Sequence, residues 1–598
     1  MRVADYIFKF LADRGVTDVF LVTGGGAMFL NDALSREKRL RPVFNLHEQA
    51  CSYAAEGYAR LRGHAGVVSV TSGPGGTNAI TGVAGAWLDS IPMFVISGQV
   101  KCEMTIPCAP GIRQLGDQEL NIVDVVKPIT KLAVQIRNVS DVKTVLEKAW
   151  YLANNGRPGP VWLDIPLDIQ SAEIDIESAE SDFDASEFAS PPIAADVVKK
   201  CADTLRKSGR PAIICGYGVR CSHAEKELID TAERLNIPVL TAISGTDLIE
   251  TSHPLFAGRP GILGARAANF IMQNCDCLLV LGSRMGIRTI GYAYDKICRA
   301  ATKIMVDIDK NELQKPTFKV DVPVWGDVKT FLELLKLELP EKPAQQEWLE
   351  YCNRLKKAYP TILAEHRERT DYVSSYVLPE ILAENAADNT IFVTGNATAY
   401  TSTFQAMPLK KNMRLLANVA CSSMGFGLPA AIGAAAAADG RPVVCLTGDG
   451  SIQMNIQEIQ TVLNYQFPIK IFVYNNDGYL FIKHTQKSFF NGNFTGADPR
   501  SGVILPDLEK ISSAYGIKYF RINNNSEAEE MVPEILGTEG CAIIEVMLDP
   551  FEQLGPKAAS KRLPDGKMVS APLEDLAPFL PREEFRANMI IDPVDEEF

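Results

Sequence analysis

The stretch "CLTGDGSIQMNIQEIQTVLNYQFPIKIFVYNNDGY" (residues 445–479) decides the fold of its region. An apolar run ends at Gly448-Asp449-Gly450, a helical pattern follows, and a second apolar run ends at Asn475-Asn476. Short apolar runs that are bounded by glycine and joined by a helix are typical of buried parallel strands. Because a crossing helix returns the chain to the same edge of the sheet, we expect Asp449 and Asn476 to lie side by side.

The residue types at these strand ends favour a divalent ion that joins a phosphorylated ligand to the protein. The Asp449 carboxylate and the Asn476 amide oxygen are hard ligands of the kind that Mg²⁺ prefers. Gly448 and Gly450 allow the backbone to approach a phosphate closely. Two unrelated turns are the alternative, and the spacing and the matching strand context make it the weaker one.

Runs of the same kind recur along the chain, with examples at 65–73, 211–218, 275–283, 303–309 and 390–396. They predict an α/β protein with three doubly wound parallel-sheet domains. An acidic, Ser-rich stretch and a Pro-, Lys- and Gln-rich stretch read as solvated connections between these domains. The predicted parts are a domain at 1–170, a linker at 171–192, a domain at 193–337, a linker at 338–368, a domain at 369–550 and a tail at 551–598.

Composition limits the partners and the compartment. The 598 residues are 46% apolar and carry a net charge of −13, which disfavours nonspecific binding to nucleic acid or to an anionic membrane. The thirteen cysteines include no CxxC pair, so most are expected to be buried thiols in a reducing compartment. The N-terminus has an amphipathic helical pattern rather than a signal peptide, and no uncharged apolar run reaches membrane-spanning length. We therefore expect a cytoplasmic protein.

Two stretches of the first domain add candidate ligand contacts. In "VTSGPGGTNAITGVAGAWLDSIPMFVISG" (70–98), a glycine-rich turn from Ser72 to Asn78 follows a predicted strand and could touch a flat ligand. The spacing does not match the G-x-G-x-x-G pattern with a later acid, so a dinucleotide dehydrogenase is disfavoured. In "FNLHEQACSYAAEGYAR" (44–60), Glu48 stands where the chain leaves the interior. Taken alone, such a residue is usually a solvated charge at a helix N-terminus.

With these motifs in order, the chain resembles thiamine-diphosphate-dependent enzymes of the acetolactate synthase group over nearly its whole length. The motifs that carry the resemblance lie at 15–34, 47–60, 71–92, 155–168, 421–434 ("CSSMGFGLPAAIGA") and 448–476. The resemblance implies a pyrimidine-binding, a central and a diphosphate-binding domain. It also implies that each active site combines domains of two subunits, so that a homodimer is the minimum active unit and a tetramer is possible.

The resemblance assigns roles to individual residues. Glu48 would hydrogen-bond a ring nitrogen of the aminopyrimidine, and the ylid that forms would attack a 2-oxoacid and release carbon dioxide. Met424 would hold the cofactor in its bent shape. Asp449 and Asn476 would bind Mg²⁺ together with the backbone oxygen of Gly478. Further cofactor contacts are implied at Pro74, Asn78, Asn396, Ser422, Gly448 and Gly450.

The substrate pocket departs from the synthase pattern. Phe481 and Thr485 stand where the synthases carry Met and Trp, so a different acceptor pocket is expected. Gln118 matches the group, and Arg113 is either a guanidinium for a carboxylate or phosphate, or a solvated surface residue. His47 and His484 flank the expected pocket. His47 is expected to orient Glu48 or to pair with the backbone, and His484 to assist proton transfer to the acceptor.

The sequence of the central domain does not decide whether the protein binds a flavin. Residues 282–291 and 306–309 resemble the flavin-site segments of the group, whereas Met285, Gly286 and Ile287 replace a more acidic run. FAD is therefore a possible cofactor that the sequence neither requires nor excludes.

The leading hypothesis is a thiamine-diphosphate- and Mg²⁺-dependent 2-oxoacid decarboxylase and carboligase with pyruvate as donor. The acceptor would be a second pyruvate or, since the tail at 560–585 is similar to relatives from cell-surface sugar pathways, a keto-sugar nucleotide. A silent cofactor-binding scaffold is the alternative from another class. Retention of Glu48, Met424, Asp449 and Asn476 together argues against it.

Overall fold

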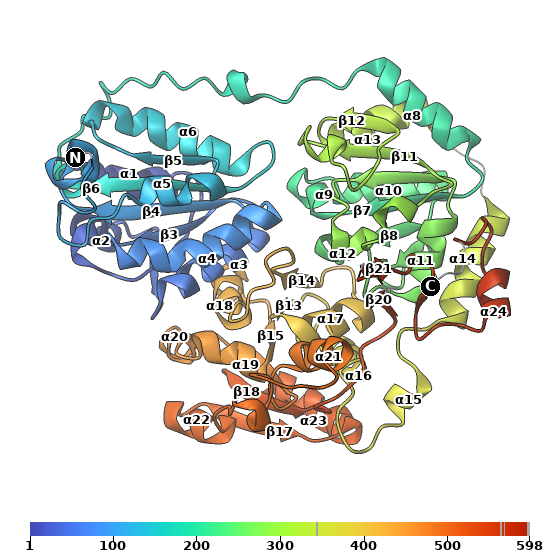
Figure 1. Ribbon diagram of the computed structural model, residues 1–598. Coiled ribbons are helices and arrows are strands. Elements are labelled where there is room, and N and C mark those ends of the chain that lie inside the picture. The colour runs from blue at the N-terminus through green and yellow to red at the C-terminus, as the bar shows by residue number, and fades with distance from the viewer. Residues whose placement is uncertain (110, 342–344, 563–564, 567, 595–598) are drawn as a thin grey trace.

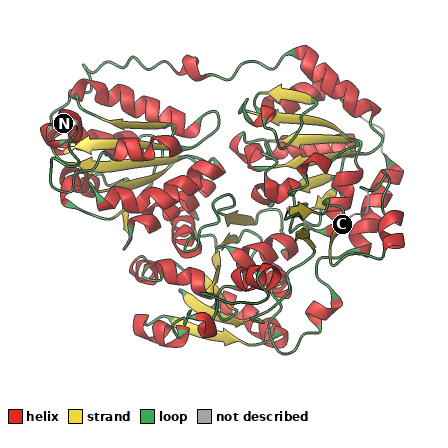
Figure 2. Ribbon diagram, in the orientation of Figure 1, coloured by secondary structure: helices red, strands yellow, loops and turns green. Residues whose placement is uncertain are grey.

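Three six-stranded parallel sheets, each covered by helices, make up most of the chain (Figures 1 and 2). The computed structural model describes residues 1–109, 111–341, 345–562, 565–566 and 568–594. The predicted α/β fold class with three parallel-sheet domains is confirmed by this arrangement.

The first and third domains share one topology. The first sheet has the order β2 (Arg41–Phe44), β1 (Asp18–Leu21), β3 (Gly66–Val70), β4 (Met93–Gln99), β6 (Pro160–Pro166) and β5 (Leu132–Gln135). The third sheet repeats it with β14 (Arg414–Ala417), β13 (Ile391–Thr394), β15 (Val443–Gly448), β16 (Ile469–Asn475), β18 (Ala542–Met547) and β17 (Lys518–Ile522). In each sheet the strand order reverses beside the first strand. Such switch points place ligands at the carboxyl ends of the strands.

The central sheet has a different order. Its strands run β12 (Val322–Trp325), β11 (Thr302–Asp307), β10 (Cys277–Leu281), β7 (Pro211–Cys215), β8 (Val239–Thr241) and β9 (Phe256–Gly258). The chain leaves β7 in one direction through β8 and β9 and later resumes at β10 on the opposite side. The switch point therefore lies between β7 and β10.

The first and third domains meet through two helices that follow equivalent second strands. Helix α3 (Glu48–Arg62) packs against α18 (Gly427–Ala437), and one apolar core joins both domains. Glycine allows the close approach, because a methyl carbon on Gly57 would lie 2.9 Å from the carbonyl carbon of Ala430. Small residues along both helices thus bring the two ligand-binding edges together.

The second predicted linker is largely folded. Within 338–368, helix α14 (Gln346–Ala358) buries Trp348, whose ring nitrogen donates a hydrogen bond to Pro211 O at 2.9 Å. The expectation of a solvated connection is wrong for this helix, because its apolar face packs on the central domain. Residues 342–344 of this linker lie outside the described residues. The first linker does cross between domains, in an extended path at the top of Figure 1.

The C-terminal tail returns to the central domain instead of staying with the third (Figure 1). Strand β19 (Lys557–Ala558) pairs with β22 (Leu576–Ala577), and α24 (Arg582–Ala587) places Phe585 against Phe270. The fully buried Asn274 fixes the end of the tail, since its Oδ1 accepts hydrogen bonds from the backbone N–H groups of Ile590 and Ile591.

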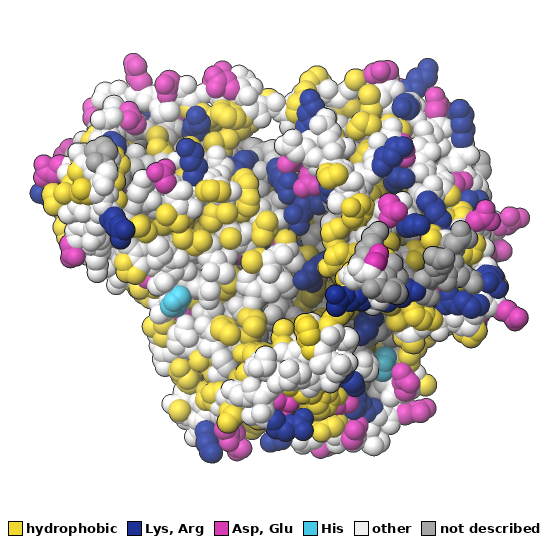
Figure 3. Space-filling model, viewed as in Figure 1, with side chains coloured by type: hydrophobic (Ala, Val, Ile, Leu, Met, Phe, Trp, Pro, Cys, Tyr) yellow, Lys and Arg dark blue, Asp and Glu magenta, His cyan; other side chains and the backbone are white. Residues whose placement is uncertain are grey.

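The surface and the thiols agree with the composition. Lys and Arg side chains line the middle of the face in Figure 3, where the domains meet. All thirteen cysteines are free thiols, eight of them buried. In the part of the chain that the structure describes, none of the helices has the length and apolarity to cross a bilayer.

Candidate functional site

The predicted metal site lies at the ends of β15 and β16, which are neighbours in the third sheet. Asp449, the first residue of α19 (Asp449–Ile452), is buried. Its carboxylate accepts the N–H of Gly450 at 2.7 Å and the N–H of Gly478 at 3.0 Å. Burial raises the pKa of Asp449 to about 6, although these N–H groups favour the ionised form. The carboxylate is thus oriented by backbone groups on both sides.

Asn476 supplies the observation that tests whether a metal fits. Its side chain is buried, and its amide nitrogen points to Thr398 Oγ at 3.5 Å. Among the described residues, its Oδ1 has no hydrogen-bond donor. A buried amide oxygen without a partner costs free energy unless something else binds it.

A Mg²⁺ ion would satisfy this oxygen. Asp449, Asn476 Oδ1 and the carbonyl of Gly478 form an all-oxygen donor set, as Mg²⁺ requires. This set has one carboxylate, which agrees with the absence of any cluster of three His, Cys, Asp or Glu side chains in the described ranges. The residues present therefore fit the ion.

Steric contacts explain why glycine occupies two positions of this site. Gly478 has φ +110°, and a methyl carbon there would lie 3.2 Å from the carbonyl carbon of Ala497. A methyl carbon on Gly450 would overlap the ring of Tyr479. Asn396 follows β13 directly beside β15, and Gly448 ends β15, so both stand at the switch point where a phosphate would bind.

The predicted pyrimidine contacts meet at the edge of the first sheet. Glu48 is the first residue of α3, and its Oε2 accepts a hydrogen bond from Asn78 Nδ2 at 3.0 Å. Pro74 and Asn78 are both exposed in the first turns of α4 (Pro74–Asp89). His47 caps α3, because its Nδ1 accepts the N–H of Gln49 at 3.1 Å. Of its two expected roles, the structure thus shows the pairing with backbone.

Two further candidates lie in the segment before this edge. Gln118 has φ +57°, and its carbonyl packs against Gly73, so that it adjoins the glycine-rich turn. Arg113 is exposed, and we find no ion pair to it among the described residues. Of these candidates, Asn78 is the residue that contacts Glu48 directly, whereas Gln118 adjoins Gly73.

The loop that carries Met424 connects β14 to α18 and is held by both domains. Asp89 accepts the N–H groups of Val419 at 2.7 Å and Ala420 at 3.0 Å. Asn418 donates to Glu56 at 3.1 Å and accepts the N–H of Ser422 at 2.8 Å. Acidic side chains of the first domain therefore fix a loop of the third.

The far end of the same loop reaches the N-terminus of α3. Asn455 Nδ2 donates to Gly425 O and to Gln49 Oε1, both at 3.0 Å. Gln49, which follows Glu48, and Gly425, which follows Met424, are thereby bridged by the Asn455 side chain. Ser422 has φ +55° in this loop.

Sequence reasoning missed Glu56 and Asp89. Burial raises the pKa of Glu56 to about 7 although Arg60 lies 2.7 Å away, and the Arg60 guanidinium also contacts Asp89 at 2.8 Å. The available signal was an acid inside an otherwise small and apolar helical stretch, which seldom occurs without a buried partner.

The expected acceptor side is formed by α21 (Leu480–Phe489). The rings of Phe481 and His484 lie 6.4 Å apart, and Thr485 is exposed on the same helix. Burial lowers the pKa of His484, with a smaller contribution from Lys557 of the tail. Its Nε2 is buried without a partner among the described residues. Burial therefore favours the neutral form of the His484 imidazole, and Nε2 is available to a ligand.

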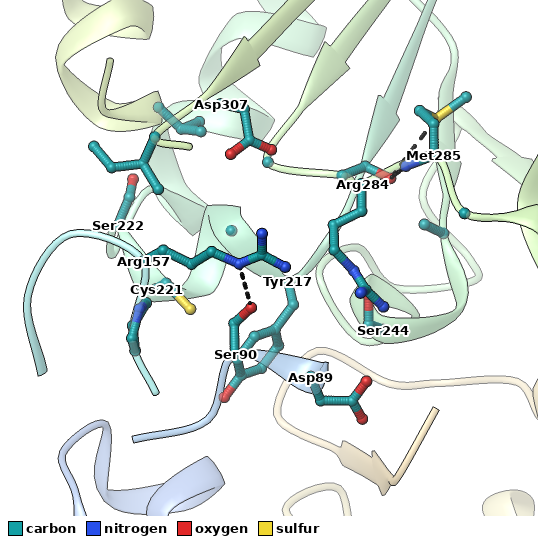
Figure 4. Close-up of a pocket in the computed structure, with 18 of the residues that line it drawn as sticks. Asp89, Ser90, Arg157, Tyr217, Cys221, Ser222, Ser244, Arg284, Met285 and Asp307 are labelled. Atoms are coloured by element: carbon teal, nitrogen blue, oxygen red, sulfur yellow. Dashed lines mark hydrogen bonds between the residues drawn. The ribbon is translucent and has the colours of Figure 1, made fainter. Parts of the chain in front are cut away.

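A separate cavity of about 540 Å³ lies at the switch point of the central domain (Figure 4). Arg284 follows β10, and Asp307 ends β11 with its pKa raised by burial to about 6. Arg157 enters from the first domain, held by Ser90 Oγ at 2.9 Å and by Asp309 at 2.8 Å. The volume is within the range of small-molecule sites, about 300–1,000 Å³.

This cavity fits a nucleotide. An acid at the end of a strand suits a ribose, and an arginine at the switch point suits a diphosphate. Gly218 and Gly282 bring two backbones into contact there, so the wall is backbone rather than side chain. Met285, one of the residues that replace the acidic run, is buried in the wall with φ +45°. These features would suit the adenosine diphosphate half of FAD and do not identify a flavin ring.

Comparison with known proteins matches all three domains to family models of one kind. The models are "Thiamine pyrophosphate enzyme, N-terminal TPP binding domain" at residues 1–122, the central domain at 198–335, and the C-terminal TPP binding domain at 394–546.

Similar curated proteins cover nearly the same length. The chain is 34% identical to the acetolactate synthase isozyme 1 large subunit of Escherichia coli K12, over 92% of this chain and 95% of the relative. It is 33% identical to the probable acetolactate synthase large subunit of Methanocaldococcus jannaschii, over 93% of each. It is 30% identical to the acetolactate synthase large subunit of Lactococcus lactis, over 92% of this chain and 93% of the relative.

Proposed function

The chain belongs to the thiamine pyrophosphate enzyme family and is an acetolactate synthase-like enzyme; from this premise we propose that it is a Mg²⁺-dependent 2-oxoacid decarboxylase and carboligase with pyruvate as donor. The observation that carries the proposal is the buried Oδ1 of Asn476 beside Asp449, which has no hydrogen-bond partner in the described part of the chain. When bound, thiamine diphosphate would supply the carbon nucleophile and the electron sink for decarboxylation.

The residues of this chain would divide the remaining work. Asp449, Asn476 Oδ1 and Gly478 O would hold Mg²⁺ and through it the diphosphate. Glu48, steadied by Asn78, would hold a proton at the pyrimidine ring. Met424 would support the bent ligand from a loop that Asp89 and Asn418 fix in place. Its position between two anchored ends limits the movement of that support.

A second subunit would complete this site. The edge around Glu48 exposes Phe44 and Leu46 by 46% and 52%, and Met454, next to Asn455, is 48% exposed. Apolar side chains exposed beside a ligand edge favour association with another surface. We propose a homodimer as the minimum assembly, and light scattering of the purified chain checks it.

The donor and the acceptor are separated by one assay. Purified chain is incubated with pyruvate, thiamine diphosphate and Mg²⁺, and carbon dioxide and 2-acetolactate are both measured. Both products support the synthase reaction. Carbon dioxide without acetolactate favours another acceptor, for which the exposed Thr485 in place of a tryptophan and Lys557 beside His484 leave space and positive charge. A keto-sugar nucleotide is then the candidate to add.

The substitution Glu48→Gln tests the chemistry directly. We expect decarboxylation to fall by about 10²–10⁴-fold, the usual contribution of a positioned acid or base, while binding of thiamine diphosphate stays measurable by calorimetry. Glu365→Gln, an exposed acid in the first turn of α15 (Ala364–Arg367), is the matched control. Turnover unchanged by Glu48→Gln would contradict the role assigned to Glu48. Binding of thiamine diphosphate by the wild type without any turnover would favour the scaffold hypothesis.

FAD occupancy of the central cavity is a separate proposal. Visible flavin absorbance of the purified chain, or its uptake after addition of FAD, supports it. Binding of ADP without binding of FAD would show that the cavity takes only the nucleotide half.

A further inference from the structure

A buried lysine lies directly behind the turn that carries two of the three expected metal ligands. Lys483 is on α21, and its side chain is 1% exposed. Its ammonium donates to the carbonyl of Asn476 at 2.8 Å and to the carbonyl of Asp477 at 3.3 Å. A lysine is almost never buried to this extent unless its charge is paired or fully hydrogen-bonded.

These two hydrogen bonds select which oxygens of the turn stay available. The turn from Asn476 to Gly478 has three carbonyls and one side-chain amide oxygen close together. Lys483 occupies two of the carbonyls, and Asp449 accepts the N–H of Gly478 from the other side at 3.0 Å. Within the described residues, Asn476 Oδ1 and Gly478 O accept no hydrogen bond.

We infer that Lys483 is a positioning residue that fixes this turn so that Asn476 Oδ1 and Gly478 O are presented to the metal ion. The inference rests on the proposed function, because it concerns the same ion. Nothing in the motif spacing requires a cation here, and a methionine or leucine could fill the volume without carrying charge.

Two physical effects of Lys483 oppose each other, and their signs make the inference testable. An ammonium near a divalent cation repels it, so removal of the charge alone should tighten Mg²⁺ binding. Loss of the two hydrogen bonds should loosen the turn and weaken binding, as removal of an outer-shell partner does by about 10–100-fold. The surrounding carboxylates of Asp449, Asp477, Asp498 and Asp549 reduce the repulsion, which favours the second effect.

The experiment measures the Mg²⁺ concentration that half-saturates thiamine diphosphate binding, by calorimetry on the full chain. Lys483→Met should raise this concentration about 10-fold or more. Lys483→Arg, which keeps charged donors, should restore most of the affinity. Lys487→Met removes the same charge from an exposed position one turn further along α21 and should change nothing.

Each other outcome overturns the inference. Equal or tighter Mg²⁺ binding by Lys483→Met would show that the hydrogen bonds of Lys483 to the turn do not govern Mg²⁺ affinity. If Lys483→Met does not fold, Lys483→Gln is the second variant, because it keeps a neutral hydrogen-bond donor. Its Mg²⁺ affinity should lie below that of the wild type, and wild-type affinity would refute the role of Lys483. If the wild-type chain binds neither Mg²⁺ nor thiamine diphosphate, the proposed function is overturned as well. If the wild type binds both and the Lys483 variants bind Mg²⁺ equally well, only the role of Lys483 is refuted and the proposed function stands.

Discussion

Replacing Gly433 with alanine should separate the helices that join the first and third domains. Gly433 lies on α18 against the backbone of α3, and an added methyl carbon would lie 2.6 Å from the carbonyl carbon of Ala54 and 2.9 Å from its Cα. Both obstacles are main-chain atoms of a packed helix. No change of rotamer can therefore relieve the overlap.

The size of the effect follows from this geometry. Carbon atoms need about 3.5 Å or more between them, so the helices must move apart by about 1 Å. Overpacking of this kind costs about 1–3 kcal/mol, and we expect about 3 here because backbone meets backbone. The better helix propensity of alanine offsets about 1 kcal/mol. The net loss in the free energy of unfolding should be about 2 kcal/mol.

The same movement should reach the site. Glu48 begins α3, and Met424 stands just before α18, so separating the helices displaces both residues from their positions. A misplacement of about 1 Å can cost about 10²-fold in rate. We expect carbon dioxide release from pyruvate to fall by this order while the separate domains stay folded.

Urea unfolding followed by circular dichroism, together with the carbon dioxide assay, checks both numbers. Gly537→Ala is the matched control, since Gly537 ends α23 (Asn525–Gly537) and no atom of the described residues lies within 4 Å of an added methyl carbon. It should stay within about 0.5 kcal/mol of wild type. Gly433→Ala with the stability and turnover of Gly537→Ala would refute the reasoning.

Two further substitutions test buried polar groups that are not among the predicted ligand contacts. Burial raises the pKa of Glu552 from 4.5 to about 7, so the folded chain binds this proton more tightly than the unfolded chain. The protonated Glu552 therefore contributes about 3 kcal/mol to the free energy of unfolding below pH 4.5, and this contribution is lost as the pH rises to about 7. Glu552→Gln should flatten this part of the pH profile of stability, as measured by urea unfolding. An unchanged slope would contradict the prediction. Asn274→Ala removes the groups that hold the end of the tail at Asn588, Ile590 and Ile591, so limited proteolysis should cut the tail earlier than in wild type. Equal cleavage times would show that the remaining tail contacts suffice.

Much of the architecture could be predicted because it is encoded locally. Apolar runs that end in glycine and alternate with helical patterns predicted three parallel-sheet domains, and all three are present. The strand–helix–strand pattern of 445–479 placed Asp449 and Asn476 at one edge, because a crossing helix leaves the two strand ends little choice. Glu48 and Asn78 meet for the same reason, at the carboxyl ends of β2 and β3.

Contacts between elements far apart in the chain could not be predicted in this way. The folded second linker and the return of the tail to the central domain depend on apolar faces whose partners the sequence does not name. Local charge patterns likewise gave no partner for Glu56 or Asp89, which accept hydrogen bonds from the Asn418 side chain and from the Val419 backbone, more than 300 residues away. Backbone N–H and carbonyl groups are identical at nearly every position, so residue types do not reveal which of them a side chain will meet.

The sequence by itself determined the class of fold, the family resemblance and the strand ends at which ligands would bind. Only the tertiary structure decided how these ends are held: Asp89 and Asn418 on the Met424 loop, and Lys483 behind the turn of Asn476. The physical reason is that the two features depend on contacts at different separations along the chain. Hydrophobic periodicity is read within one helix or strand, whereas the orientation of a buried polar side chain is settled by the backbone that packs over it.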